Sequence, residues 1–330
     1  MKSFNLYVTI SLCTMAVAWL LEVSVFAQSP RYVLIVHGGA GNLTPENTTA
    51  DQIEAVFSGL QNALDTGETI LKAGGSALDA VEAAVRVLED DSTFNAGRGA
   101  VLNAKGEVEL DAAIMDGSNI KAGAVAGVQT VKNPVTLARR IMEASPHVML
   151  IGSGAEEFAK QQQLEIVDQN YFKTIRRRNE HWRLIQQQEQ QESGGTVGAV
   201  ALDSEGNLAA ATSTGGMAMK RYGRVGDVPV IGAGTYANNN SCAVSATGHG
   251  EFFIRNVVSY DIAALMKYKG MPLKEAAHYV IMDKLAEQGG KGGVIAVDRE
   301  GNFSMPFNTS AMARGFVTSD GRTGKLIFRE

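Results

Sequence analysis

Cysteine is scarce in this sequence of 330 residues, which contains only Cys13 and Cys242. Cys13 lies in a segment that we predict to be removed, and one remaining thiol cannot form an internal disulfide. The fold must therefore be stabilised by its apolar core, for which roughly 300 residues are ample. No proline- and serine-rich linker divides the chain into separate domains.

An excess of positive charge is also lacking, since the formal net charge at pH 7 is -5. Removal of residues 1–27 takes away one lysine and one glutamate, so the charge stays the same. A mildly acidic chain without a basic block excludes nucleic acid and anionic membrane surfaces as expected partners.

Long uninterrupted apolar runs are missing, and the one candidate lies at the N-terminus. Lys2 precedes an apolar stretch over residues 8–23 that threonine and serine interrupt, so it is too short for a transmembrane helix. Val25 and Ala27 place modest-sized residues three before and just before Gln28, which suits a signal peptidase, and we predict a signal peptide over residues 1–27. Export to the periplasm or outside the cell follows, although Glu22 leaves an uncleaved anchor as an alternative.

Several common site motifs are absent. There is no Walker A sequence and no G-x-S-x-G elbow, which removes P-loop nucleotide binding and the usual serine hydrolases. Gly152-Ser153-Gly154 is too short for a dinucleotide fingerprint. The five histidines lack the close spacing of a zinc site; they are His37, His147, His181, His249 and His278.

Strand-like and helix-like segments alternate in blocks, which predicts a layered architecture of sheets and helices. Residues 51–71 are expected to be helical in two pieces, broken near Thr66-Gly67. Further helices are expected around residues 251–269 and 273–287. Between the two halves, glutamines accumulate from about residue 161 to 195, and we predict an exposed, flexible linker there.

Gly195-Thr196-Val197 directly follows this glutamine-rich stretch and opens a strand-like run. A threonine hydroxyl needs a base to become a nucleophile, and its own α-amine, with a pKa of roughly 7.7–8.0, could serve. That amine becomes free only when the preceding peptide bond is cut. Alternatively, Thr196 simply opens a β-strand, where threonine is common, and these residues alone favour this second interpretation.

Three other polar clusters allow two interpretations each. Thr212 and Thr214 share one face at the end of a predicted strand, before a glycine turn. Arg224 and Asp227 could form a surface ion pair worth under about 1 kcal/mol, or could bind the α-carboxylate and α-ammonium of an amino acid. Thr247-Gly248 could be an ordinary turn or could supply a hydroxyl and an N–H to an oxyanion.

Taken together, the motifs resemble the plant-type asparaginase/isoaspartyl peptidase family of N-terminal nucleophile hydrolases, over nearly all of the chain after the signal peptide. The resemblance implies an α+β fold, a four-layer αββα sandwich, made as a precursor that cuts itself between Gly195 and Thr196. The products would be an α subunit, residues 28–195, and a β subunit, residues 196–330, which form one domain and pair as (αβ)2. The motifs are His37-Gly38-Gly39-Ala40-Gly41, Phe94-Asn95-Ala96-Gly97, Gly195 to Val200, Thr212 to Gly216, Gly223 to Asp227 and Thr247-Gly248.

The resemblance also implies a role for each matching residue. Thr196 would be the nucleophile, supported by Thr214, and Thr247 Oγ1 and the Gly248 N–H would form the oxyanion hole. The substrate would be held by Arg224 and Asp227, with Asn95 lining the pocket. No cofactor would be required, but a structural sodium ion would bind backbone oxygens of Leu88, Glu89, Asp91, Phe94, Ala96 and Arg98.

The activity implied by the resemblance is hydrolysis of L-asparagine and of N-terminal β-aspartyl dipeptides through a β-aspartyl ester on Thr196. Two alternatives stay open. An aspartylglucosaminidase would cleave a glycosylated asparagine with the same nucleophile, and a non-catalytic relative would only bind an amino acid.

Overall fold

The computed structural model describes residues 31–187 and 195–329, so the predicted signal peptide lies outside the described residues. The helices are α2 (Ala50–Lys72), α3 (Ala77–Asp90), η1 (Gly97–Gly99), α4 (Pro134–Ala144), α5 (Gly152–Gln161), α6 (Gln169–Phe172), α7 (Ile175–Gln187), α8 (Gly250–Asn256), α9 (Val258–Lys269), α10 (Leu273–His278) and η2 (Tyr279–Leu285). The strands are β1 (Val33–Gly41), β2 (Leu110–Asp116), β3 (Ala122–Val128), β4 (Met149–Ile151), β5 (Val197–Leu202), β6 (Leu208–Thr214), β7 (Thr235–Ala237), β8 (Cys242–Gly248), β9 (Gly292–Asp298), β10 (Phe303–Ser304), β11 (Ala311–Thr318) and β12 (Thr323–Phe328).

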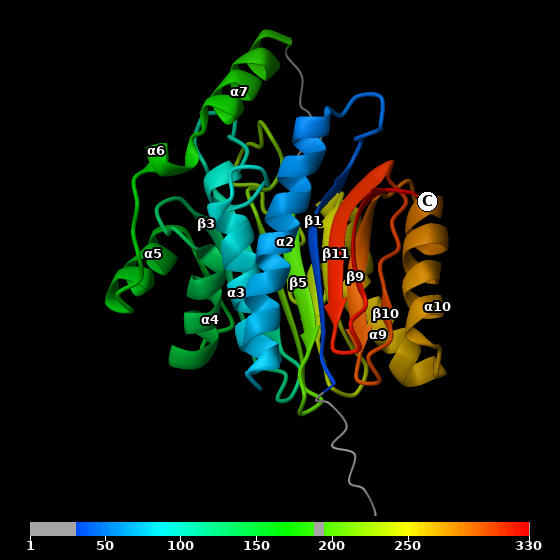
Figure 1. The fold of residues 1–330 in the computed structure, drawn as a ribbon. Helices are drawn as coiled ribbons and strands as arrows, with labels where there is room; N and C mark the ends of the chain where they lie inside the picture. The colour runs from blue at the N-terminus through cyan, green and yellow to red at the C-terminus, as the bar shows by residue number, and fades with distance from the viewer. Residues whose placement is uncertain (1–30, 188–194, 330) are drawn as a thin grey trace, which may run out of the picture.

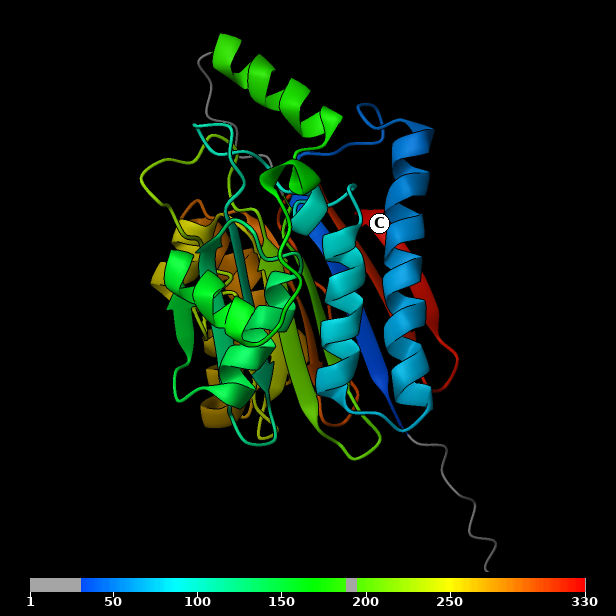
Figure 2. The ribbon, with the colours of Figure 1, turned by 90° about the vertical axis from the view of Figure 1, so that its left-hand side faces the viewer.

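Two β-sheets lie face to face between two layers of helices (Figure 1). The large sheet has the order β12-β11-β1-β5-β6-β2-β3-β4, and the small sheet has the order β10-β9-β8-β7. Helices α2 and α3 cover the outer face of the large sheet, as Figure 2 also shows, while α9 and α10 cover the small sheet. This arrangement confirms the predicted α+β four-layer sandwich.

Strands β5 and β6 lie at the centre of the large sheet, and all of their residues are buried. Because side chains alternate across a strand, Ala199 and Ala201 pack toward the helices, while Val200 and Leu202 pack between the two sheets. A strand covered on both faces is expected to be apolar throughout, which explains the continuous apolar run after Thr196. The core thus holds the segment that begins at the candidate nucleophile.

The prediction that the helix over residues 51–71 would break near Gly67 was wrong, because α2 continues without interruption. A capping box between Thr49 and Gln52 starts the helix. Gly67 is buried, and a Cβ there would lie 2.6 Å from Leu34 Cδ2. Glycine at this position lets the helix approach β1 closely, and that packing outweighs its low helix propensity.

The helix expected over residues 251–269 consists of two helices, α8 and α9. They are divided at Val257, whose left-handed backbone (φ +48°) ends the first helix and starts the second. The helix expected over residues 273–287 forms as α10, which continues directly into the π-helical segment η2.

Part of the flexible linker predicted for residues 161–195 is helical, because α6 and α7 lie within it. Residues 188–194 of the predicted linker lie outside the described residues. Arg177 is buried, donates a hydrogen bond from Nε to the Gly99 oxygen (2.6 Å) and pairs with Glu180. Leu184 is buried in a small apolar cluster with Val101. The glutamine-rich composition hid these few anchoring residues, which dock α7 on the domain.

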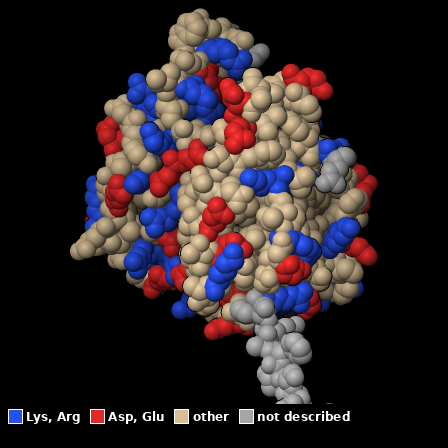
Figure 3. All heavy atoms as spheres, in the orientation of Figure 1, with Lys and Arg blue, Asp and Glu red and all other residues tan. Residues whose placement is uncertain are grey.

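The surface seen in Figure 3 carries lysine and arginine interspersed with aspartate and glutamate, without a large region of one sign on that face. None of the helices within residues 31–187 and 195–329 is long and apolar enough to cross a membrane.

Candidate active site

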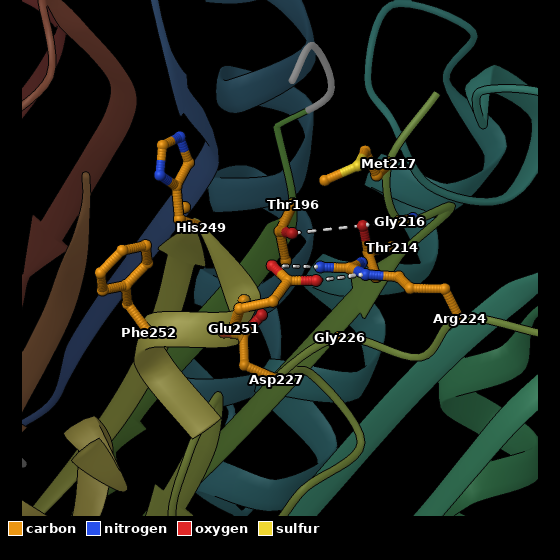
Figure 4. Close-up of a pocket in the computed structure, with 12 residues that line it drawn as sticks. Thr196, Thr214, Gly216, Met217, Arg224, Gly226, Asp227, His249, Glu251 and Phe252 are labelled. Carbon is orange, nitrogen blue, oxygen red and sulfur yellow. Dashed lines mark hydrogen bonds and ion pairs between the residues drawn. The ribbon is translucent and has the colours of Figure 1, made fainter. Parts of the chain in front are cut away.

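A pocket of about 280 Å³ opens where the ends of β5, β6 and β8 meet (Figure 4). This volume lies near the lower end of the roughly 300–1,000 Å³ range of small-molecule sites, which suits a small polar ligand. The lining residues are Thr196, Thr214, Gly216, Met217, Arg224, Gly226, Asp227, Gly248, His249, Gly250, Glu251 and Phe252.

Thr196 and Thr214 lie side by side at the end of neighbouring strands. The antiparallel register pairs Val197 with Ser213, which places Thr196 opposite Thr214. Their Oγ1 atoms are 3.2 Å apart, within hydrogen-bonding distance. Thr214 Oγ1 also accepts a hydrogen bond from the Gly216 N–H (2.9 Å), so the orientation of its hydroxyl is fixed by the turn after β6.

Thr247 brings the small sheet to the same point. Its Oγ1 accepts hydrogen bonds from the backbone N–H groups of Thr196 and Ala40, each at 3.2 Å. Gly248 follows at the pocket wall with a φ of +150°, and a Cβ there would lie 2.4 Å from the Lys291 oxygen. Only glycine fits this turn, which ends β8 beside the candidate nucleophile.

The Gly195–Thr196 peptide packs tightly against the main chain of β1, next to the irregularity in strand register between His37 and Gly39. A Cβ on Gly39 would lie 2.3 Å from Gly195 Cα, and a Cβ on Gly195 would lie 2.5 Å from Gly39 Cα. Gly39 also has a φ of +111°, which disfavours any other residue. In the sequence analysis Gly39 appeared only as part of a motif, and its contact with the predicted cleavage site became visible only in the structure.

A buried chain of polar groups lies behind Thr196, between the sheets. His37 Nε2 lies 2.9 Å from Ser245 Oγ, which lies 2.7 Å from Thr212 Oγ1, and Thr235 donates to Thr212 (2.8 Å). Burial lowers the pKa of His37 to about 3, so the ring is neutral. A Cβ at Gly198 would lie 2.0 Å from Ser245 Oγ, so this glycine makes room for the network.

Arg224 and Asp227 both line the pocket, but they do not pair with each other in the part of the chain that the structure describes. Arg224 instead binds the Glu251 carboxylate through two bonds, Nε to Oε1 (3.0 Å) and Nη2 to Oε2 (3.1 Å). Asp227 is buried, and its Oδ2 has no partner among the described residues. Burial raises the pKa of Asp227 to about 7, and a cationic ligand would compensate this buried carboxylate.

Asn95 does not line the pocket, which corrects the prediction made for its side chain. Its Nδ2 donates to the Gly216 oxygen (2.8 Å), and its Oδ1 accepts from the Val101 N–H (2.8 Å). The amide is therefore used on both sides to hold the turn that follows Thr214. Asn95 supports the pocket wall from behind.

The residues predicted to bind sodium span the end of α3, the connection that follows and η1, in which Gly97 has a φ of +46°. Leu88 and Glu89 lie in the last turn of α3, and Arg98 lies in η1. The oxygens of Asp91 and Ala96 accept turn hydrogen bonds from Phe94 N (3.3 Å) and Gly99 N (3.0 Å). Backbone carbonyl oxygens are a kind of ligand that hard cations accept, and the sodium site stays a prediction.

The sequence analysis missed Glu251, Met217 and Phe252, all of which line the pocket. Glu251 follows the Thr247-Gly248 motif closely and lies in the first turn of α8, where an acidic residue is common. Its proximity to Arg224 left no signal, because 27 residues separate the two in sequence.

Two sheets between two layers of helices, with a threonine at the start of a central strand, define the architecture of the N-terminal nucleophile hydrolases. The chain matches the asparaginase family over residues 30–327 and belongs to that family. The resemblance inferred from the motifs is thereby confirmed.

Related proteins carry two kinds of name. The chain is 50% identical over 313 residues to the isoaspartyl peptidase of Escherichia coli (strain K12), covering 91% of this chain and 97% of that protein. It is 45% identical over 302 residues to the isoaspartyl peptidase/L-asparaginase of Mus musculus, covering 89% of each. The isoaspartyl peptidase/L-asparaginase of Xenopus laevis is 43% identical over 293 residues, 87% of this chain and 93% of that protein.

Proposed function

We propose that this protein hydrolyses the side-chain amide of L-asparagine and the isopeptide bond of N-terminal β-aspartyl dipeptides, with Thr196 as nucleophile. The observation that carries the proposal is the 3.2 Å contact between the Thr196 and Thr214 hydroxyls at the wall of a pocket that also contains Arg224 and Asp227. The names of the related proteins support the same substrates.

The nucleophile would be activated by self-cleavage of the Gly195–Thr196 bond. The close packing of Gly39 against this peptide supports that step, because it holds the scissile bond in one place. The mature protein would then contain the α subunit, residues 28–195, and the β subunit, residues 196–330, assembled as the heterotetramer (αβ)2.

In the hydrolysis itself, the freed α-amine of Thr196 takes the hydroxyl proton, and Oγ1 attacks the β-carbonyl carbon of the substrate. Thr247 Oγ1 and the Gly248 N–H stabilise the oxyanion. Ammonia or an amine leaves with a proton, and a β-aspartyl ester remains on Thr196. Water then attacks the ester, releases aspartate and returns the proton to Oγ1. The Thr214 hydroxyl keeps Oγ1 oriented throughout.

Substrate recognition would use the charged end of the pocket. The Arg224 guanidinium binds the α-carboxylate, and the Asp227 carboxylate binds the α-ammonium. Asp227 Oδ2 has no partner in the part of the chain that the structure describes, which supports this role, since an ammonium group would supply the missing hydrogen bond. Arg224 and Asp227 together form what we call the clamp. The clamp recognises an α-carboxylate and an α-ammonium group, which asparagine and β-aspartyl dipeptides share.

The remaining expectations concern a structural sodium ion and the compartment in which the protein works. Backbone oxygens of the loop after α3 would hold a structural sodium ion that orders the segment carrying Asn95, and no cofactor takes part in the chemistry. Residues 1–27 would direct the protein to the periplasm or outside the cell.

The proposal is tested by a denaturing gel, N-terminal sequencing and product assays on wild type and Thr196→Ala. We expect wild type to give a fragment beginning Thr-Val-Gly-Ala and to release aspartate from asparagine and β-aspartyl dipeptides. Thr196→Ala should stay uncut and lose about 10⁴-fold or more in turnover. As a control, Thr323→Ala, at an exposed position of β12, should behave as wild type.

Other results would favour the alternatives. Faster hydrolysis of a glycosylasparagine than of β-aspartyl dipeptides would indicate an aspartylglucosaminidase. An uncut wild-type chain that binds aspartate without turnover would indicate a non-catalytic relative.

A further inference from the structure

The Arg224 guanidinium lies close to two glycines and forms an ion pair with Glu251. A Cβ at Gly226 would lie 2.8 Å from Nη1, and a Cβ at Gly250 would lie 2.8 Å from Nη2, so both glycines leave room for the guanidinium. Glu251 accepts hydrogen bonds from Nε and Nη2 with its two carboxylate oxygens. Figure 4 shows these two side chains facing each other beside Thr196 and Thr214.

The ion pair with Glu251 occupies one edge of the Arg224 guanidinium and leaves several of its N–H donors available. Arginine has five N–H donors, of which the Glu251 carboxylate takes one on Nε and one on Nη2. The remaining donors, on Nη1 and Nη2, suffice for a second carboxylate. Glu251 therefore need not leave when a ligand carboxylate binds.

Glu251 also connects the two ends of the pocket. It lies only four positions after Thr247 in the segment that ends β8 and starts α8, whereas Arg224 belongs to the separate loop after β6. The ion pair thus ties that loop to the segment with the oxyanion donors. In asparagine one carbon separates the α-carbon from the β-carbonyl, so the distance between clamp and nucleophile must be set accurately.

We propose that Glu251 is a positioning residue that orients the Arg224 guanidinium toward the substrate α-carboxylate and sets its distance from the Thr247-Gly248 turn. The inference rests on the proposed function, because it assigns the α-carboxylate to Arg224. Loss of the Glu251 charge leaves the guanidinium mobile, which weakens binding of the substrate more than it slows attack by Thr196.

The test compares L-asparagine kinetics of Glu251→Gln, Glu251→Asp and wild type. Glu251→Gln should raise KM about tenfold while kcat changes less than about twofold, since one charge-assisted bidentate contact is lost. Glu251→Asp, which retains the carboxylate, should recover part of the affinity. Glu275→Gln, at an exposed site on α10, removes the same charge elsewhere and should leave KM unchanged.

A double-mutant cycle separates this role from a general structural one. In an Arg224→Lys background, Glu251→Gln should raise KM little further, because both changes remove the same oriented guanidinium group. Full additivity of the two changes would overturn the proposal. An unchanged KM in Glu251→Gln would also overturn it, and a lowered KM would show that Glu251 competes with the substrate.

The proposed function has its own readout in these assays. Wild type that releases no aspartate from asparagine would contradict the function itself. Active wild type with the wrong response to Glu251→Gln would contradict only the role of Glu251.

Discussion

The two ends of the pocket are built differently. At one end, Thr196, Thr214 and Thr247 are 7%, 2% and 1% exposed, and their hydroxyls are held by strands of both sheets. At the other end, the Arg224 and Glu251 side chains are 21% and 53% exposed and belong to a loop and to the first turn of a helix. The first end is ordered by packing and the second by charge, so changes at the first should affect chemistry and changes at the second should affect binding.

The largest effect is expected where the packed end is tightest. Gly39→Ala would place a methyl group 2.3 Å from Gly195 Cα, which must displace the peptide before Thr196. A shift of about 1 Å at a reacting bond can cost about 10²-fold, so self-cleavage followed on a denaturing gel should slow by at least about that factor.

Gly74→Ala is a matched control for this change. Gly74 also has a positive φ, +80°, but an added Cβ there would have no atom of the described residues within 4 Å. Gly74→Ala therefore causes backbone strain comparable to that of Gly39→Ala but no clash with a neighbouring residue. If both variants cut equally slowly, strain in the fold and not the contact with Gly195 would explain the effect.

The charged end should respond through binding. Arg224→Lys replaces a planar fork with a single ammonium group that cannot bind a carboxylate bidentately. We expect kcat/KM for asparagine to fall about 10- to 100-fold, mainly through KM. Arg322→Lys, at an exposed ion pair between β11 and β12, should stay within about twofold of wild type. An unchanged kcat/KM in Arg224→Lys would remove the clamp assignment.

A smaller effect is expected in the pH profile, to which both ends contribute. Asp227 must be ionised to bind an ammonium group, and burial raises its pKa to about 7. The Thr196 amine must be unprotonated to act as a base, with a reference pKa of roughly 7.7–8.0. Since both groups must lose a proton, kcat/KM should fall as the pH drops below about 8, and the slope should become steeper than one proton below about 7.

Asp227→Asn tests which end contributes which proton. The variant should bind substrate more weakly at every pH, and its profile should fall with the slope of a single proton. Asp65→Asn, at an exposed site on α2, should keep the wild-type slope. A slope unchanged by Asp227→Asn would show that Asp227 does not titrate with substrate binding.

Much of the packed end could be predicted from local sequence. The run after Thr196 is apolar because β5 is buried on both faces, and Thr212 and Thr214 alternate with Ser213 as strand residues must. The order of the motifs also led to the family and its fold. Composition misled us at α7, where a few buried anchors such as Arg177 and Leu184 order a glutamine-rich segment.

The sequence by itself determined the family, the four-layer fold and the hydroxyls available at the start of β5, because these depend on patterns within short segments. Only the tertiary structure decided that Gly39 packs on the Gly195–Thr196 peptide and that Arg224 pairs with Glu251, while Asp227 Oδ2 has no hydrogen-bond partner within residues 31–187 and 195–329. These contacts join residues that are distant in the chain or lie in loops. Their geometry follows from how the sheets and α8 pack together, which no local pattern encodes.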